Sequence, residues 1–252
     1  MFASRAQRHG VSGVVDVGFT DRHGGVSPPP CDSLDLAGGA AGALGARSFR
    51  AAASERNFAL LAREFNVAGF VTMRQVHGAE VAVVGPRNQA GSVADALVTS
   101  AADVALCVRV GDCVPVVLAD ADRGVVGVVH AGRPGVVAGV VAAAVRTMRS
   151  SGAQDIEAWV GPHVCGGCYE VPTALRAEVA AAAPAGFACT TWGTPAVDIG
   201  AAVRAQLGLC GCVVNDLAVC TLESDDLYSY RRDGSGSGRS AGVVVLRGQP
   251  RD

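Results

Sequence analysis

The chain has 252 residues, of which half are hydrophobic and only 5% are aromatic, so its core must be built mainly from Val, Ala and Leu. This length allows one large domain or two small ones. The formal net charge is −2, and no basic block could neutralise a run of phosphates, which argues against binding to nucleic acid. The longest apolar stretch, residues 135–145, is shorter than the roughly 20 residues of a transmembrane helix.

The predicted location follows from the first residues and from the cysteines. Residues 1–18 lack the uninterrupted apolar segment of a secretory signal. The nine cysteines are an odd number, in a chain too long to need a disulfide scaffold. Both observations favour a cytoplasmic protein with reduced cysteines and no membrane association, and they leave the oligomeric state open.

The predicted elements begin after a polar N-terminus. Residues 1–13 are mixed and polar, and we expect them to be disordered. A first strand is expected at 14–19. Paired Gly and three Pro predict a loop at 22–30, and the Gly/Ala-rich residues 38–45 are expected to be mobile. No repeat or linker divides residues 14–252, which favours one mixed α/β domain.

The rest of this domain alternates between apolar strands and amphipathic helices. Short Val-rich segments bounded by Gly, Asp and Pro predict strands at 70–73, 81–84, 104–110, 114–118, 125–129, 156–160 and 241–246. Helices are predicted at 51–65, 136–150, 172–183 and 199–207. Gly152 is placed to end the second helix, and Pro172 to start the third. A flexible loop is predicted at 233–239.

Three residues with metal-binding side chains lie at the ends of predicted strands. His77 follows one strand beside Gly78, which would let a ligand approach closely, although a surface or capped His is the simpler interpretation. Cys113 lies with Asp112 between two apolar strands, although a buried Cys is ordinarily an inert small hydrophobe. His130 ends a strand before small residues and a helix, where a satisfied core His is the alternative.

Together these three residues predict a catalytic zinc site. His, Cys and His are good zinc ligands, and three protein ligands leave the fourth tetrahedral position open for water or substrate. Their spacing matches no local zinc-finger pattern, so the spacing adds little to the prediction. The same residues could instead form a metal-free Cys–His nucleophile pair, with Cys113 activated by His77 or His130.

Other motifs have an ordinary packing explanation beside the functional one. Cys165 and Cys168 have metal or redox spacing, but no second pair with that spacing accompanies them. Cys210 and Cys212 are too close in sequence to chelate one ion easily. His163 is a candidate to line the pocket. The segment 231–234 is either an anion site, since Arg offers a planar fork of donors, or a solvated turn.

Ten short segments, in order along the chain, carry a resemblance to a known family. They are RHGGVS (22–27), QVHG (75–78), ADALVT (94–99), GDCVPV (111–116), HAG (130–132), GP (161–162), CYEV (168–171), CT (220–221), YRRDG (230–234) and GR (238–239). In these motifs the chain resembles the YfiH-like proteins, also called the multicopper polyphenol oxidoreductase or laccase-domain family. The resemblance covers about residues 14–246.

The resemblance implies a layered α/β/β/α sandwich and a zinc ion held by His77, Cys113 and His130, with copper as a possible alternative metal. It implies zinc-dependent phosphorolysis of adenosine, inosine or methylthioadenosine with free phosphate as the second substrate, together with adenosine deamination. Alternative implied roles are hydrolysis of wrongly loaded peptidoglycan precursors and copper-dependent polyphenol oxidation. A non-catalytic metal-binding module is a further hypothesis.

Five residues are predicted to act on the substrate. Cys113 and Asp112 are predicted to be catalytic, with Asp112 as a proton shuttle. Arg56, Gln75 and Arg231 are predicted to bind substrate, the arginines by holding an anion. The chain departs from the family at three points: Arg-Pro-Gly (133–135) replaces Trp-Arg-Gly, Gly-Cys-Tyr (167–169) replaces Cys-Cys-Tyr, and Glu-Arg-Asn (55–57) replaces Glu-Asn-Arg. The last change displaces Arg56 by about 100° around a helix. If this Arg holds phosphate, the displacement affects phosphorolysis first.

Overall fold

The computed structural model describes residues 1–38, 46–86 and 91–248, except for the side chains of 46–48. The segment predicted to be mobile, 38–45, lies outside the described residues apart from Gly38. The α-helices are α1 (Ala46–Glu64), α2 (Arg133–Ala138), α3 (Val140–Ser150), α4 (Thr173–Ala182), α5 (Ile199–Leu209) and α6 (Tyr230–Asp233). None of the described helices is long and apolar enough to cross a membrane.

Most strands belong to two mixed sheets. The five-stranded sheet has the order β1 (Phe2–Gly10), β2 (Gly13–Thr20), β13 (Ser240–Gly248), β6 (Ala105–Val110) and β3 (Phe70–Val71). The six-stranded sheet has the order β12 (Val213–Asp216), β9 (Glu157–Val160), β7 (Val114–Asp120), β8 (Val125–Ala131), β5 (Ala96–Thr99) and β4 (Val81–Val83). A small pair is formed by β10 (Phe187–Cys189) and β11 (Pro195–Val197).

The two large sheets pack face to face, because alternate side chains of their strands fill one shared core. Val17 of β2, Val108 of β6 and Val244 of β13 meet Val117 of β7 and Val128 of β8 in this core. All residues of β7 and β8 are buried, which explains why they read as continuous apolar runs without alternation.

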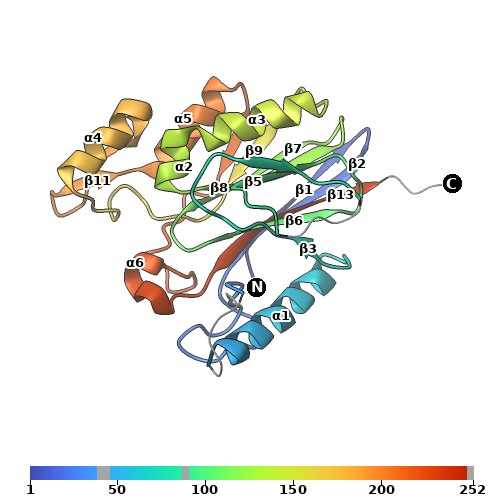
Figure 1. The fold of residues 1–252 in the computed structure, drawn as a ribbon, viewed down its shortest axis with the longest axis horizontal. Helices are drawn as coiled ribbons and strands as arrows, with labels where there is room; N and C mark the ends of the chain where they lie inside the picture. Colours follow the sequence, from blue (N-terminus) through green and yellow to red (C-terminus); the bar gives the residue numbers. More distant parts are fainter. Residues whose placement is uncertain (39–45, 87–90, 249–252) are drawn as a thin grey trace.

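Helices cover the outer face of each sheet (Figure 1). Leu61 of α1 and Phe65, which follows the end of α1, pack on the outer face of the five-stranded sheet, against Val243 and Val245. On the other side, α2, α3 and α5 pack on the six-stranded sheet, with Val141 of α3 in that core. The layers are therefore helix, sheet, sheet and helix, and the α/β/β/α sandwich implied by the resemblance is confirmed.

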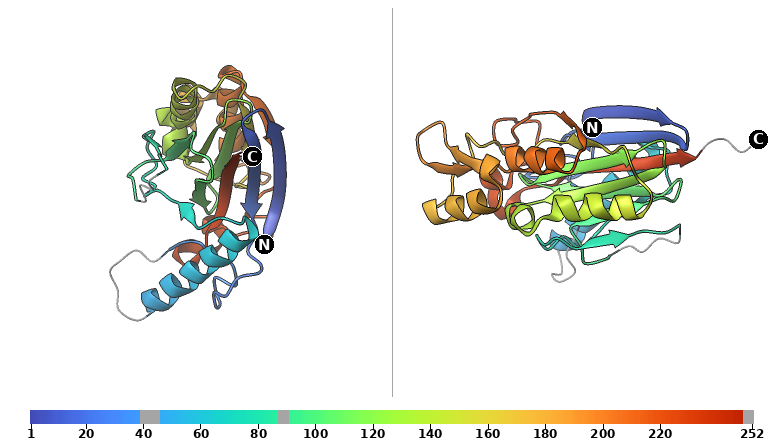
Figure 2. Two further views of the ribbon diagram at one scale, coloured as in Figure 1. Left: turned by 90° about the vertical axis from the view of Figure 1, so that its right-hand side faces the viewer. Right: turned by 90° about the horizontal axis from the view of Figure 1, so that it is seen from above.

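The prediction of a disordered N-terminus was wrong. Residues 2–10 form β1, which pairs antiparallel with β2 over its whole length as an outer hairpin (Figure 2). No residue of β1 is fully buried, so the strand lacks an apolar pattern. Its polar side chains still contribute contacts: Arg8 forms an ion pair with Glu157 at 2.8 Å and stacks over Trp159 at 5.3 Å.

The predicted helices were found with shifted ends. The helix predicted at 136–150 is two helices, because Gly139 adopts φ +82° and separates α2 from α3. The helix predicted at 51–65 begins earlier, at Ala46. The loop predicted at 233–239 is partly regular, since it contains the end of α6 and a 3-10 turn at Gly234–Gly236.

Candidate functional site

The three predicted metal ligands converge in space. His77 lies in the loop between β3 and β4, Cys113 in the turn between β6 and β7, and His130 near the end of β8. Their ligand atoms all lie within 4.8 Å of one another, and Cys113 Sγ is 3.9 Å from His77 Nε2. Tetrahedral zinc with bonds of 2.0–2.3 Å needs ligand atoms roughly 3.3–3.8 Å apart, so these side chains fit an ion after small adjustments.

A buried carboxylate, Asp95, organises two of the three ligands. Its side chain is fully buried and accepts a 2.8 Å hydrogen bond from His130 Nδ1, which directs Nε2 of that ring toward the candidate ion. Asp95 also accepts hydrogen bonds from the backbone N–H groups of Val76, His77 and Gly78 at 2.7–3.2 Å. This second layer fixes both the ring tautomer of His130 and the position of the His77 loop.

The charges in this cluster favour the thiolate form of Cys113. Burial would raise the pKa of Cys113, but hydrogen bonds with His130 and His77 and their positive charge lower it to about 6. Burial would lower the pKa of His130, but its hydrogen bonds with Asp95 and Cys113 raise it to about 9. The thiol of Cys113 is thus stabilised as the thiolate that a metal requires.

Two non-glycine residues at the site have left-handed backbones. His77 has φ +61° and Asp112 has φ +82°, conformations that cost of order 1–3 kcal/mol each. The His77 loop is held by Asp95. Asp112 is held by two 2.6 Å hydrogen bonds, from the hydroxyl of Thr221 and the backbone N–H of Arg231. Buried carboxylates therefore compensate the backbone strain on both sides of the cluster.

Gly132 leaves the space in which the ligands meet. A Cβ atom at this position would lie 2.6 Å from His77 Cδ2 and 3.3 Å from Cys113 Sγ. Such contacts are too short for a side chain, so Gly132 is required by the packing of His77 against Cys113.

The three ligands lie in the wall of a cavity of about 820 Å³. Five arginines also line the cavity: Arg74, Arg109, Arg133, Arg231 and Arg239. The guanidinium of Arg231 stacks over the ring of Tyr169 at 4.9 Å, and that of Arg239 over Tyr230 at 5.4 Å. A space of this size with cations beside a ligand cluster is suited to an anionic or anion-accompanied small molecule.

The predicted substrate-binding residues differ in their positions. Arg231 and Gln75 line the cavity. Both ends of the Gln75 amide are bonded to the backbone of Arg109, at 2.7 and 3.0 Å, so Gln75 ties the His77 loop to β6. Arg56 is exposed on α1 and is not among the cavity-lining residues. The structure therefore does not bring Arg56 to this cavity. Its neighbour Asn57 faces inward instead, and the Asn57 amide donates to Ser27 and to the carbonyls of residues 33 and 35.

His163 does not line the main cavity either. It is buried, its Nδ1 donates to the carbonyl of Gly161 at 2.8 Å, and its ring packs against Gly200 of α5. Asp112 does line the cavity, beside the ligand Cys113. The most important residue absent from the site predictions is Asp95. Its signal in the sequence was its place in the ADALVT segment (94–99), one of the motifs that carry the family resemblance.

Comparisons with known proteins show what the whole chain is similar to. The family described as multi-copper polyphenol oxidoreductase laccase matches residues 16–247. The chain is 49% identical over 247 residues to a purine nucleoside phosphorylase of Streptomyces coelicolor, covering 95% of this chain and 98% of the relative. It is 43% identical over 233 residues to a purine nucleoside phosphorylase of Mycobacterium tuberculosis, covering 90% of each.

Solved structures show the same fold. YlmD from Geobacillus stearothermophilus matches with a TM-score of 0.78 and 26% identity, covering 94% of this chain and 93% of that one. The hypothetical protein YfiH of Bacillus licheniformis matches with a TM-score of 0.80 and 23% identity, covering 96% and 99%. The overall fold is therefore shared with these structures.

Proposed function

The chain belongs to the family described as multi-copper polyphenol oxidoreductase laccase, and from this premise we propose that it is a zinc-dependent purine nucleoside phosphorylase of the cytoplasm. Its substrates would be phosphate and adenosine, inosine or methylthioadenosine, with adenosine deamination as a second activity. The observation that supports this most is the arginine-lined cavity with His77, Cys113 and His130 in its wall. Relatives with 43–50% identity bear the name purine nucleoside phosphorylase.

The residues support zinc more than copper oxidation. Zinc is bound well by a His, Cys, His set, and when bound it would polarise phosphate or lower the pKa of water. Oxidation through several copper ions needs a larger histidine set. The chain has five histidines, and among the described residues only one candidate metal cluster contains any of them.

The side chains around the cavity suggest a division of roles. Stacking on Tyr169 uses the face of the Arg231 guanidinium and leaves its N–H edge for phosphate. Each carboxylate oxygen of Asp112 accepts one hydrogen bond, Oδ1 from the hydroxyl of Thr221 and Oδ2 from the backbone N–H of Arg231. An ionised carboxylate has about four acceptor sites, so Asp112 keeps the capacity to accept a proton from substrate or water.

The central test incubates the purified protein with adenosine, with and without phosphate, and separates the products by chromatography. We expect adenine and ribose 1-phosphate only when phosphate is present, and loss of both after chelation until zinc is returned. If inosine is the only product and forms without phosphate, only the deaminase part of the proposal would remain. Hydrolysis of a muramyl-peptide precursor without nucleoside turnover would replace the proposal with an editing role, and no turnover of any of these would leave a metal-binding module.

A further inference from the structure

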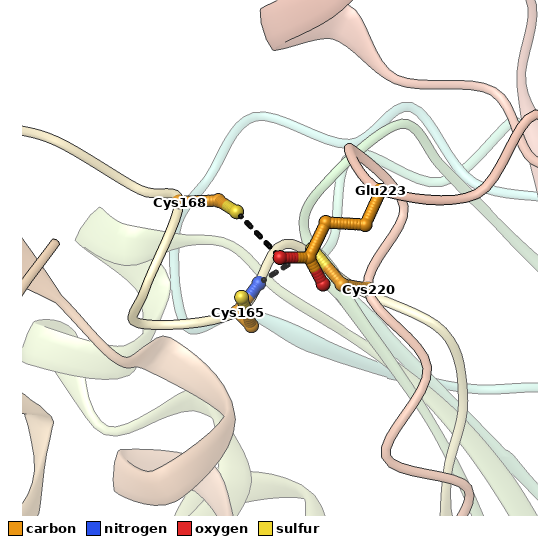
Figure 3. A group of neighbouring side chains, drawn as sticks. All are labelled: Cys165, Cys168, Cys220 and Glu223. Atoms are coloured by element: carbon orange, nitrogen blue, oxygen red, sulfur yellow. Dashed lines mark hydrogen bonds between the residues drawn. The ribbon is translucent and has the colours of Figure 1, made fainter. Parts of the chain in front are cut away.

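A second group of metal-binding side chains lies outside the His77, Cys113 and His130 site. Cys165, Cys168, Cys220 and Glu223 point toward one another (Figure 3). Their ligand atoms all lie within 4.8 Å of one another. The thiol of Cys168 donates to Glu223 Oε1 at 3.3 Å, and Cys220 Sγ accepts from the backbone N–H of Cys165 at 3.4 Å.

Two turns bring these four residues together. Cys165 and Cys168 form a C-x-x-C pair, and Cys220 and Glu223 form a C-x-x-E pair, so each turn supplies two side chains three residues apart. A short parallel bridge between His163 and Cys220 joins the two segments, with backbone hydrogen bonds of 3.1 and 3.0 Å. The sequence showed the first pair, but only the fold places the second pair beside it.

The tight turn of the first pair depends on Gly166. A Cβ atom at Gly166 would lie 2.7 Å from the Cβ of Asp198, so a larger residue there would push the turn off its support. Cys168 and Cys220 are buried, Cys165 is partly buried, and Glu223 is exposed at the rim. Three thiols at this distance, with a carboxylate at the rim, form a set of four donors.

We propose that Cys165, Cys168, Cys220 and Glu223 hold a second zinc ion, in a closed structural site. Structural zinc sites in proteins are four-coordinate, with thiolates as their commonest ligands and carboxylates also used. A tetrahedron with 2.3 Å zinc–sulfur bonds needs sulfur atoms roughly 3.8 Å apart, within about 1 Å of the spacing here. Binding one ion releases the three thiol protons to solvent and forms three zinc–sulfur bonds and one zinc–oxygen bond.

This second ion would stiffen the wall of the catalytic cavity. Tyr169, which carries the stacked Arg231, directly follows Cys168. Thr221, whose hydroxyl holds Asp112, directly follows Cys220. An ion bound by both turns would therefore hold Tyr169 and Thr221 in place together, without contacting the substrate.

Metal content under reducing conditions tests the proposal. The protein is reconstituted with zinc, passed through a desalting column and measured for zinc per chain. We expect two zinc ions in the wild type, and one in Cys220→Ser and in Cys168→Ser. We also expect one in Cys113→Ser, which removes only the other site. Cys212→Ser, a similarly buried thiol outside both clusters, should keep two.

Cobalt substitution identifies which site remains. The Cys113→Ser variant should retain strong thiolate-to-cobalt charge-transfer absorption from three thiolates, whereas Cys220→Ser should retain the weak absorption of one. Far-UV circular dichroism checks that each variant is folded. Glu223→Gln covers the case in which the cysteine variants do not fold: it should release zinc to a chelator about tenfold faster than wild type.

Two results would overturn the second site independently of the proposed activity. One is a wild-type zinc content of one, unchanged in Cys220→Ser and Glu223→Gln but abolished in Cys113→Ser. The other is a Cys165–Cys168 disulfide that persists in reductant and excludes metal, found by mass spectrometry of the intact protein. Neither result bears on nucleoside turnover, and loss of turnover would not remove the second zinc.

Discussion

The two clusters of metal-binding side chains are built in different ways. His77, Cys113 and His130 come from three separate strand ends and face a cavity of about 820 Å³. The second cluster comes from two turns, and its four side chains point toward one another. An open set of three ligands suits chemistry on a substrate, and a closed set of four suits structural support.

The clusters differ also in what lies behind their ligands. The first is backed by the buried Asp95, which orients His130 and the His77 loop. The Cys165 and Cys168 turn is held by backbone hydrogen bonds and by glycine packing instead. We infer that a site open to solvent needs an outer carboxylate to keep its geometry, whereas a closed site is held together by its ion.

Replacing a metal ligand of the first cluster should have the largest effect on activity and should leave the second cluster unchanged. In Cys113→Ser the hydroxyl does not ionise to bind metal, so the first site should lose its ion while the second keeps its own. Mutating a residue that supports a metal ligand typically lowers metal affinity or activity about 10–100-fold. Losing a ligand itself should therefore lower phosphorolysis by more than about 100-fold. The measurement is kcat/KM together with metal content. Activity within tenfold of wild type would contradict a catalytic role for this cluster.

Removing the charge behind the first cluster should have a smaller effect. Asp95→Asn keeps the shape but weakens the bond to His130 Nδ1, and metal affinity at the first site should fall about 10–100-fold. Asp120→Asn is the matched control, because this buried carboxylate also accepts backbone N–H groups, from residues 123, 154 and 155. Competition with a chelator measures the affinity, and equal losses in both variants would refute the role of Asp95.

Filling the space at Gly132 tests the packing of the first cluster. Gly132→Ala places a Cβ atom against His77, and overpacking of about 1–3 kcal/mol should reduce metal affinity there about tenfold. Gly208→Ala in α5 is the control, since a Cβ atom there meets nothing within 4 Å. Zinc titration of both proteins decides the point. Unchanged affinity in Gly132→Ala would show that the His77 loop can move without cost.

The arginines should give the smallest effect. We propose that the solvent-exposed Arg231 donates to phosphate, so Arg231→Ala should cost about 1 kcal/mol of binding, or about a fivefold rise in the KM for phosphate. Arg56→Ala, on the outer face of α1, should leave that KM within about twofold. Initial rates at varied phosphate concentration distinguish the two. A larger change in Arg56→Ala would return Arg56 to the substrate site.

Strands β7 and β8, which are buried on both faces, could be predicted from the sequence, because their apolar residues form unbroken runs. Burial alone did not decide the outcome, since the buried β5 was not predicted whereas the edge strands β3 and β4 were. The edge strand β1 was not predicted either. Every residue of β1 retains some exposure, and its pairing with β2, not an apolar pattern, makes it a strand. Three further short strands were not predicted either: β10, which pairs with β11, and β12, which pairs with β9.

The candidate site was predictable where strand ends present unusual residues, as for His77, Cys113 and His130. The supporting residues were not, because support depends on distances in space. Asp95 is one Asp among many in the sequence, and only the fold places it behind two ligands. In the motif Glu-Arg-Asn (55–57), the sequence did not reveal that Asn57 is the side chain that faces inward.

The place of β13 between β2 and β6 has a consequence for the newly made chain. On the ribosome, β2 and β6 emerge long before β13 does, so the edges that β13 will occupy stay unpaired during most of synthesis. Such edges are templates for pairing with other chains. We expect the nascent protein to depend on chaperones until residues 240–248 are released and join the sheet.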